Sequence, residues 1–147
     1  MKSDVKEVLA VPAGESFQCV KNNSIHACST SYSYKPARYM TFRQKGGEME
    51  TLYRVESIFE MNPYDKNALE RISPKYSDRV KNYINDRMRM WPFQGSAKRR
   101  FYVLSETDRI ELTHKPRLLR NIQGHCYFTL DELRRGKKVV QVASKQS

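Results

Sequence analysis

The chain has 147 residues, close to the size of one ordinary domain, so we expect one compact domain over 1–140 and a short flexible tail over 141–147. It carries 27 Lys and Arg against 16 Asp and Glu, a formal net charge of +11, which favours an anionic partner, with nucleic acid before a membrane surface. Because 39% of the residues are hydrophobic and 11% are aromatic, the composition excludes a disordered chain.

The first part of the chain predicts strands. The segment 50–61 gives the strongest signal, because Tyr53, Val55 and Phe59 alternate with polar side chains. The expected elements up to residue 65 are, in chain order, a strand over 5–11, a hairpin of strands 16–20 and 24–28 around the turn 21–23, a loop over 29–36, and strands over 37–44 and 50–61 that are joined at Gly46 and Gly47.

Residues 66–90 change to a helical pattern, with Ser73-Pro74 as cap and first-turn proline and Trp91-Pro92 as the end. The apolar stripe of this helix consists of Tyr76, Val80, Tyr83, Ile84 and Met88. The later expected elements are strands over 99–104 and 109–114 joined by 105–108, and a short helix that begins at the capping box 129–132 and stops at Gly136. Together they predict an α+β fold, a small curved, mainly antiparallel sheet or pseudo-barrel with a central helical insertion over 66–90 and a short late helix.

The excess of positive charge lies in the second part of the chain. Residues 1–65 contain 8 basic and 8 acidic side chains, whereas residues 66–147 contain 19 basic and 8 acidic ones. Any single basic cluster can be a solvated turn or helix end, but several clusters of one sign predict a shared basic surface. The residues that we expect to bind nucleic acid are Arg87, Arg89, Lys98, Arg99, Arg100, Lys115, Arg117 and Arg120.

Neither metal binding nor catalysis is indicated by the motifs. Cys19, Cys28 and Cys126 form no CxxC pair, and no further ligand stands at zinc spacing beside His26 and Cys28. The P-loop, GxGxxG and GxSxG patterns are absent. We therefore expect no cofactor, no metal and no enzymatic activity. The sequence has no run of 18 apolar residues and no signal-peptide pattern at its start, so we expect no membrane segment and a cytoplasmic location.

Two groups of segments resemble small PUA-like domains of the EVE and ASCH type. The first group is 11–17, 35–42 and 53–58, and the second is 102–104, 110–112 and 124–133, where residues 127–133 follow the pattern Y-x-T-L-x-x-L. The resemblance does not extend to 66–90. It implies a small β-barrel, a reader of RNA or of modified DNA bases, and a setting in prokaryotic or phage defence systems.

Aromatic side chains near the basic clusters suggest base stacking. Tyr32 and Tyr34 lie in an expected loop, and Trp91 flanks a proline close to Lys98. Flat rings stack on unpaired bases while cations neutralise phosphates, although packing in the core is the alternative role for each ring. We therefore predict a non-catalytic module that binds DNA or RNA. The alternatives are a phage-type inhibitor or interaction protein whose basic face docks on an acidic protein partner, and an enzyme with an unrecognised site.

Overall fold

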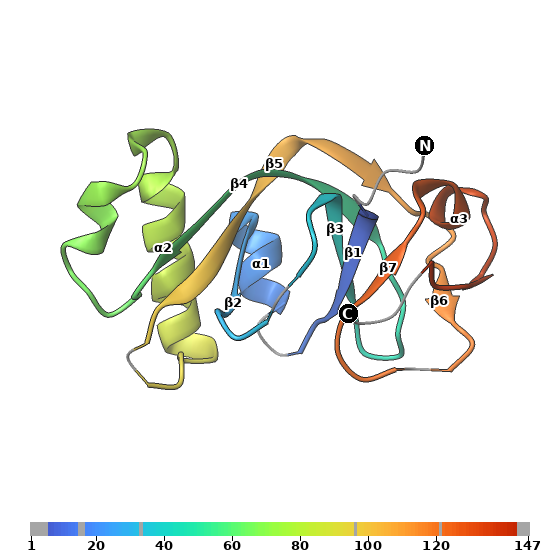
Figure 1. Ribbon diagram of the computed structural model, residues 1–147, viewed down its shortest axis with the longest axis horizontal. Coiled ribbons are helices and arrows are strands. Elements are labelled where there is room, and N and C mark those ends of the chain that lie inside the picture. The colour runs from blue at the N-terminus through green and yellow to red at the C-terminus, as the bar shows by residue number, and fades with distance from the viewer. Residues whose placement is uncertain (1–5, 15–16, 33, 96, 121, 144–147) are drawn as a thin grey trace. The chain divides into compact units, whose positions relative to one another are not determined.

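The computed structural model describes residues 6–14, 17–32, 34–95, 97–120 and 122–143. Its elements (Figure 1) are β1 (Lys6–Pro12), α1 (Phe17–Asn23), β2 (Ile25–Ser29), β3 (Ala37–Arg43), β4 (Thr51–Met61), the 3₁₀-helix η1 (Ala68–Arg71), α2 (Pro74–Met90), β5 (Arg99–Glu111), β6 (Arg117–Leu118), β7 (Cys126–Phe128), α3 (Leu130–Arg134) and β8 (Val139–Val140). The chain divides into two compact units. Unit 1 comprises Met1–Gly14, Ser33–Val55 and Ser105–Ser147, and unit 2 comprises Glu15–Tyr32 and Glu56–Leu104. The single domain expected over 1–140 stays a prediction, and each unit is described by itself.

Hydrogen bonds order six strands as β2-β5-β4-β3-β1-β7, and β6 pairs with β8 in a second sheet. β1 runs parallel to β3 and antiparallel to β7, with Val8 opposite both Tyr39 and Phe128. The pairs β2–β5 and β3–β4 are antiparallel. The predicted fold class, α+β with a small curved and mainly antiparallel sheet, is confirmed.

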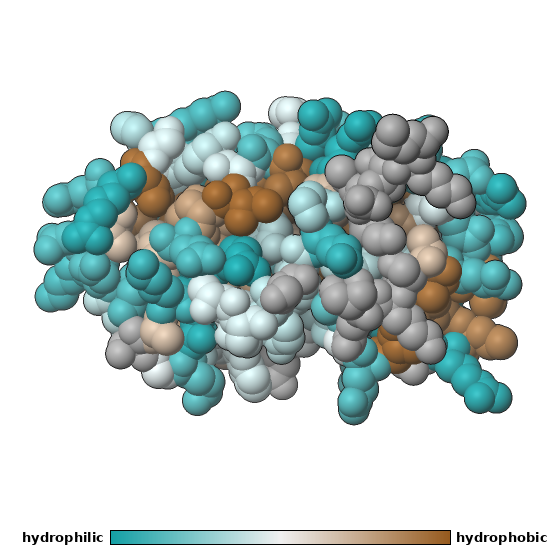
Figure 2. Space-filling model, in the orientation of Figure 1, coloured by the Kyte–Doolittle hydropathy of each residue, from teal (hydrophilic) through white to brown (hydrophobic). Residues whose placement is uncertain are grey.

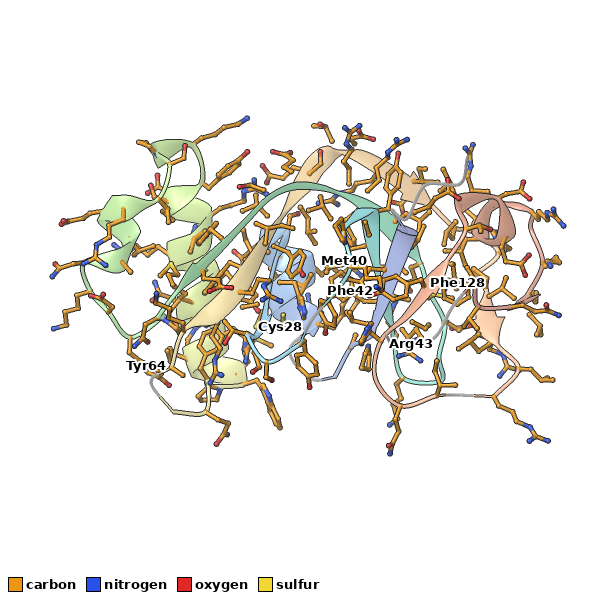
Figure 3. All side chains as sticks on the ribbon, in the orientation of Figure 1. Cys28, Met40, Phe42, Arg43, Tyr64 and Phe128 are labelled. Atoms are coloured by element: carbon orange, nitrogen blue, oxygen red, sulfur yellow. The ribbon has the colours of Figure 1, made fainter. Side chains whose placement is uncertain are left out.

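The core of unit 1 is built around β1. The segment Val8 to Val11 is apolar and buried throughout, so packing covers both faces of β1, and β3 and β7 pair with its two edges. Phe42 of β3 packs edge-on against Tyr53 of β4, with ring centroids 5.8 Å apart; Figure 3 labels Phe42. The buried core cluster consists of Val8, Ala10, Met49, Leu52, Leu112, Leu118, Cys126, Phe128, Leu133 and Val140.

The end of the chain in unit 1 follows the predicted helix signals. The side chain of Thr129 accepts a hydrogen bond from the Glu132 amide at 3.1 Å, and Gly136 ends the segment with a φ of +86°. Hydrogen bonding continues past residue 140. The amide of Gln141 donates to Glu132 at 2.8 Å, and that of Ala143 donates to the Tyr127 carbonyl at 2.7 Å. Residues 144–147 of the expected tail lie outside the described residues.

Helix α2 of unit 2 confirms the predicted helical stretch. The Ser73 side chain accepts from the Lys75 amide at 3.3 Å, and the helix runs to the residue before Trp91. The predicted apolar stripe faces inward, with Tyr83 fully buried against Phe101 at a centroid distance of 6.2 Å. Phe59 of β4 stacks on Phe101 at 5.4 Å, so an aromatic cluster forms the core of this unit. No helix in the described part of the chain is both long and apolar enough to cross a bilayer.

The predicted hairpin over 16–28 is wrong in its first half. Residues 17–23 form α1, and only Ile25–Ser29 is a strand. Cys19, Val20 and Asn23 are buried at helical spacing, which a short window cannot separate from alternation. The Asn23 side chain fixes the helix by donating to the Cys19 carbonyl at 2.9 Å and to Asp86 at 2.8 Å, and Ser24 turns the chain with a φ of +55°.

The two strands predicted over 99–104 and 109–114 are one continuous strand, β5, which ends at Glu111. The polar run 105–108 contains typical turn residues and therefore suggested a break. Instead, the Ser105 hydroxyl accepts from the amides of Thr107 at 3.2 Å and Asp108 at 2.7 Å. These local bonds satisfy the backbone while the strand continues.

Candidate nucleic-acid interface

Unit 2 contains a cavity of about 330 Å³ between the end of β2, the residues after α2 and the start of β5. Its walls include Tyr32, Trp91, Arg87, Arg99 and Cys28, and we call it the aromatic cavity; Figure 3 labels Cys28. No carboxylate is among the described residues that line it. Two of the three predicted stacking residues and two of the predicted basic residues therefore border one space.

Tyr32 and Trp91 are exposed aromatic rings held on anchored backbone. Their exposed fractions are 49% and 47%, unlike the buried rings of the core below them. The Tyr32 carbonyl accepts from Arg100 Nη1 at 2.5 Å, and the Trp91 carbonyl accepts from Arg87 Nε at 2.7 Å. The face shown in Figure 2 is mainly hydrophilic, and hydrophobic residues form separate patches on it. The rings are thus accessible while their main chain is fixed.

Arg87 is a buried arginine at the wall of the aromatic cavity. Only 8% of the residue is exposed, and its guanidinium lies 4.0 Å from the ring centroid of Phe93. Its Nη1 donates to the Tyr83 hydroxyl at 2.9 Å, and the Ala27 amide donates to the same oxygen at 3.1 Å. Sequence reasoning placed Arg87 among the residues of a basic surface; the structure buries it and holds it by hydrogen bonds to Trp91 and Tyr83.

The other predicted basic residues of unit 2 have mixed environments. Arg99 donates to the Gln94 carbonyl and stands 5.8 Å from the Phe93 ring, at the cavity wall. Arg100 is paired with Glu60 at 3.3 Å. Lys98 is exposed and lines a second cavity of about 340 Å³. Arg89 is exposed and paired with Asp86.

The remaining predicted basic residues, Lys115, Arg117 and Arg120, are exposed residues of unit 1. Arg117 belongs to β6, and its backbone amide donates to the Lys138 carbonyl at 2.8 Å. The basic cluster 115–120 therefore adjoins the basic cluster 134–138. Lys115 Nζ is 4.0 Å from Glu50. One basic surface shared by the sequence clusters 87–89, 98–100, 115–120 and 134–138 stays a prediction.

Tyr34 lies in unit 1 rather than in the aromatic cavity, and it packs on His125 with ring centroids 4.6 Å apart. Arg43, only 6% exposed and labelled in Figure 3, donates to the carbonyls of Ile122 at 3.0 Å and of Gly124. Burial and the nearby Arg43 charge lower the pKa of His125. Sequence reasoning missed that Arg43 and His125 are buried, because one arginine within a strand gives no signal of burial.

Burial weakens the acidity of the Cys28 thiol in the aromatic cavity. Burial raises the pKa of Cys28 to about 11, against the smaller opposing effect of the Arg100 and Arg99 charges. The thiol is therefore protonated at neutral pH, which leaves it a poor nucleophile and a poor metal ligand. In the described part of the chain, no three His, Cys, Asp or Glu side chains gather into a group that could hold a metal ion.

Comparison with known proteins gives a structural likeness alone. No family model matches the chain. No curated protein matches it in sequence. The chain is similar to crystal structures of the ASCH protein from Zymomonas mobilis. An alanine-substituted variant is 12% identical, with a TM-score of 0.48 over 86% of this chain and 91% of that one. A phenylalanine-substituted variant is 11% identical (TM-score 0.41, 95% of this chain and 92% of that one), and the unsubstituted form is 10% identical (TM-score 0.40, 95% of this chain and 89% of that one).

Proposed function

We propose that the protein binds single-stranded nucleic acid without catalysing a reaction, by taking an unpaired base into the aromatic cavity. The setting suggested by the sequence resemblance is that of a base reader in a defence-type system. The observation that carries the proposal is the composition of the cavity wall, where two half-exposed rings stand beside two arginines and no carboxylate lines it among the described residues.

Each part of this wall matches a part of a nucleotide. Exposed rings offer stacking area to any base, which is worth about 1–3 kcal/mol per base. Arginines attract the phosphate backbone and contact base edges, whereas carboxylates would repel it. A volume of about 330 Å³ lies at the lower end of the range typical of small-ligand sites, which suits one nucleotide rather than a duplex.

The first test measures stacking. Binding of labelled single-stranded RNA, single-stranded DNA and duplex DNA is titrated at several salt concentrations with the unsubstituted protein and with Tyr32→Leu and Trp91→Leu. We expect each substitution to weaken binding by about 1–3 kcal/mol and to leave thermal stability unchanged. Tyr76→Leu is the control, because this half-buried ring of the same unit does not line the cavity. Equal affinity for all four proteins would refute the stacking role.

The second test measures charge. Arg99→Ala should lower the slope of log affinity against log salt concentration by the amount expected for the loss of about one phosphate contact. Replacing Lys98, Arg99 and Arg100 together should lower this slope further. Lys81→Ala removes the same charge from an exposed position of α2 and serves as the control. If no nucleic acid binds in a salt-dependent manner, the protein-docking alternative replaces this proposal.

A further inference from the structure

Arg87 is a buried charge with neutral partners. Its hydrogen bonds go to the Trp91 carbonyl and the Tyr83 hydroxyl, and it forms no ion pair within 4.0 Å in the described part of the chain. Burial raises the pKa of Tyr83, so its hydroxyl is uncharged at neutral pH. A buried guanidinium without a carboxylate is costly unless another acceptor completes its hydrogen bonding.

The unused donors of Arg87 are accessible from the cavity. A guanidinium has five N–H donors, and the Trp91 and Tyr83 bonds use two of them. Nη2 forms no hydrogen bond in the described part of the chain. It is not an enclosed atom, because the enclosed polar atoms without a hydrogen bond belong to other residues. Arg87 is among the residues that line the aromatic cavity, so a guest there comes within reach of this side chain.

The guanidinium is also held rigidly. It donates hydrogen bonds to the Trp91 carbonyl and the Tyr83 hydroxyl, and it packs against the ring of Phe93. A phosphate contact needs only a mobile charge at the surface. A guanidinium fixed at the cavity wall, with Nη2 and the second Nη1 hydrogen left unbonded by the described residues, can instead donate to two adjacent acceptors on a planar group.

We propose that Arg87 reads the edge of the base in the aromatic cavity and selects bases with two adjacent hydrogen-bond acceptors; this inference rests on the proposed function. Guanine offers such an edge at O6 and N7, and cytosine offers one at O2 and N3. Adenine, uracil and thymine have no two adjacent acceptors: N1 and N7 of adenine stand beside the N6 amino group, and both carbonyls of uracil or thymine stand beside N3–H. Such an N–H faces a residue that only donates. No carboxylate among the described residues of the wall is present to accept from those N–H groups.

The test uses the unsubstituted protein and an oligonucleotide of abasic sites that carries one guest base. Guests are guanine, cytosine, adenine, uracil and 7-deazaguanine, which lacks the N7 acceptor. We expect guanine or cytosine to bind about 5-fold to 150-fold more tightly than adenine and uracil. If guanine is the preferred base, 7-deazaguanine should lose most of that advantage; if cytosine is preferred, the deaza change should leave the ranking intact.

The variant Arg87→Lys keeps the charge and removes the fork. We expect it to reduce the ratio between preferred and disfavoured guests while tight salt-dependent binding remains, and a circular-dichroism melt shows whether it folds. Equal affinity for all guests, or preference for adenine or uracil, overturns the base-reading inference and leaves the proposed function standing. Failure of every guest and of every natural single strand to bind overturns both.

Discussion

Acid should destabilise the protein through His26, which lies on β2 beside Tyr102 with ring centroids 6.3 Å apart. Burial, and then the positive charge of Arg87, lower the pKa of this imidazole from 6.5 to about 4. In the unfolded chain the group takes up its proton near pH 6.5. Protonation therefore favours the unfolded state as the pH falls, and the free energy of unfolding should decrease between about pH 6.5 and pH 4.

The magnitude follows from the difference between the two pKa values. One pKa unit corresponds to about 1.4 kcal/mol, so the protein should lose about 3 kcal/mol of unfolding free energy between pH 7 and pH 4 from His26 alone. This is a large fraction of the total stability of an ordinary domain.

The assay is urea denaturation at pH 7, 6, 5 and 4 for the unsubstituted protein and for His26→Gln. Carboxylates and His125 titrate in both proteins, so the difference between the two pH profiles isolates His26. We expect the unsubstituted protein to lose about 3 kcal/mol more than the variant over this range. Parallel profiles would refute the claim that burial and Arg87 keep the imidazole neutral.

Substitutions at three further positions test local features by urea denaturation. Gly46 has a φ of +91° with open space around its Cα, so Gly46→Ala should cost about 1 kcal/mol from backbone strain alone, and an unchanged midpoint would contradict this reason. Thr129→Ala removes the cap on the Glu132 amide and should cost about 1 kcal/mol, whereas Thr129→Ser should restore it. Tyr83→Phe leaves the buried Ala27 amide without its acceptor and should cost about 1–3 kcal/mol; a loss under about 0.5 kcal/mol would show that the amide finds another partner.

Elements with long periodic patterns could be predicted from the sequence. Over 51–61 one strand face is buried or half-buried and the other carries Arg54 and Glu60, so the alternation alone identified β4. Helix α2 had both a cap signal and an apolar stripe. Helix α1 has only seven residues, and its stability depends on the Asn23 contact with Asp86, which is distant in sequence and gives no local signal.

The candidate site was predictable in its residue types and not in their roles. Loop position and proline neighbours drew attention to Tyr32 and Trp91, and clustering of charge drew attention to Arg87 and Arg99. What no pattern gives is that Arg87 is buried, because its partners are a carbonyl and a hydroxyl brought together by folding. For the same reason the buried Arg43 was not anticipated.

The position of Trp91 gives the protein a built-in optical probe. It is the single tryptophan of the chain, it is half-exposed, and it stands at the wall of the aromatic cavity with its main chain clamped by Arg87. Any planar guest that stacks on the indole changes the surroundings of this ring directly. Emission of the unlabelled protein therefore reports occupancy of this one cavity, and its quenching curve measures affinity without a dye on either partner.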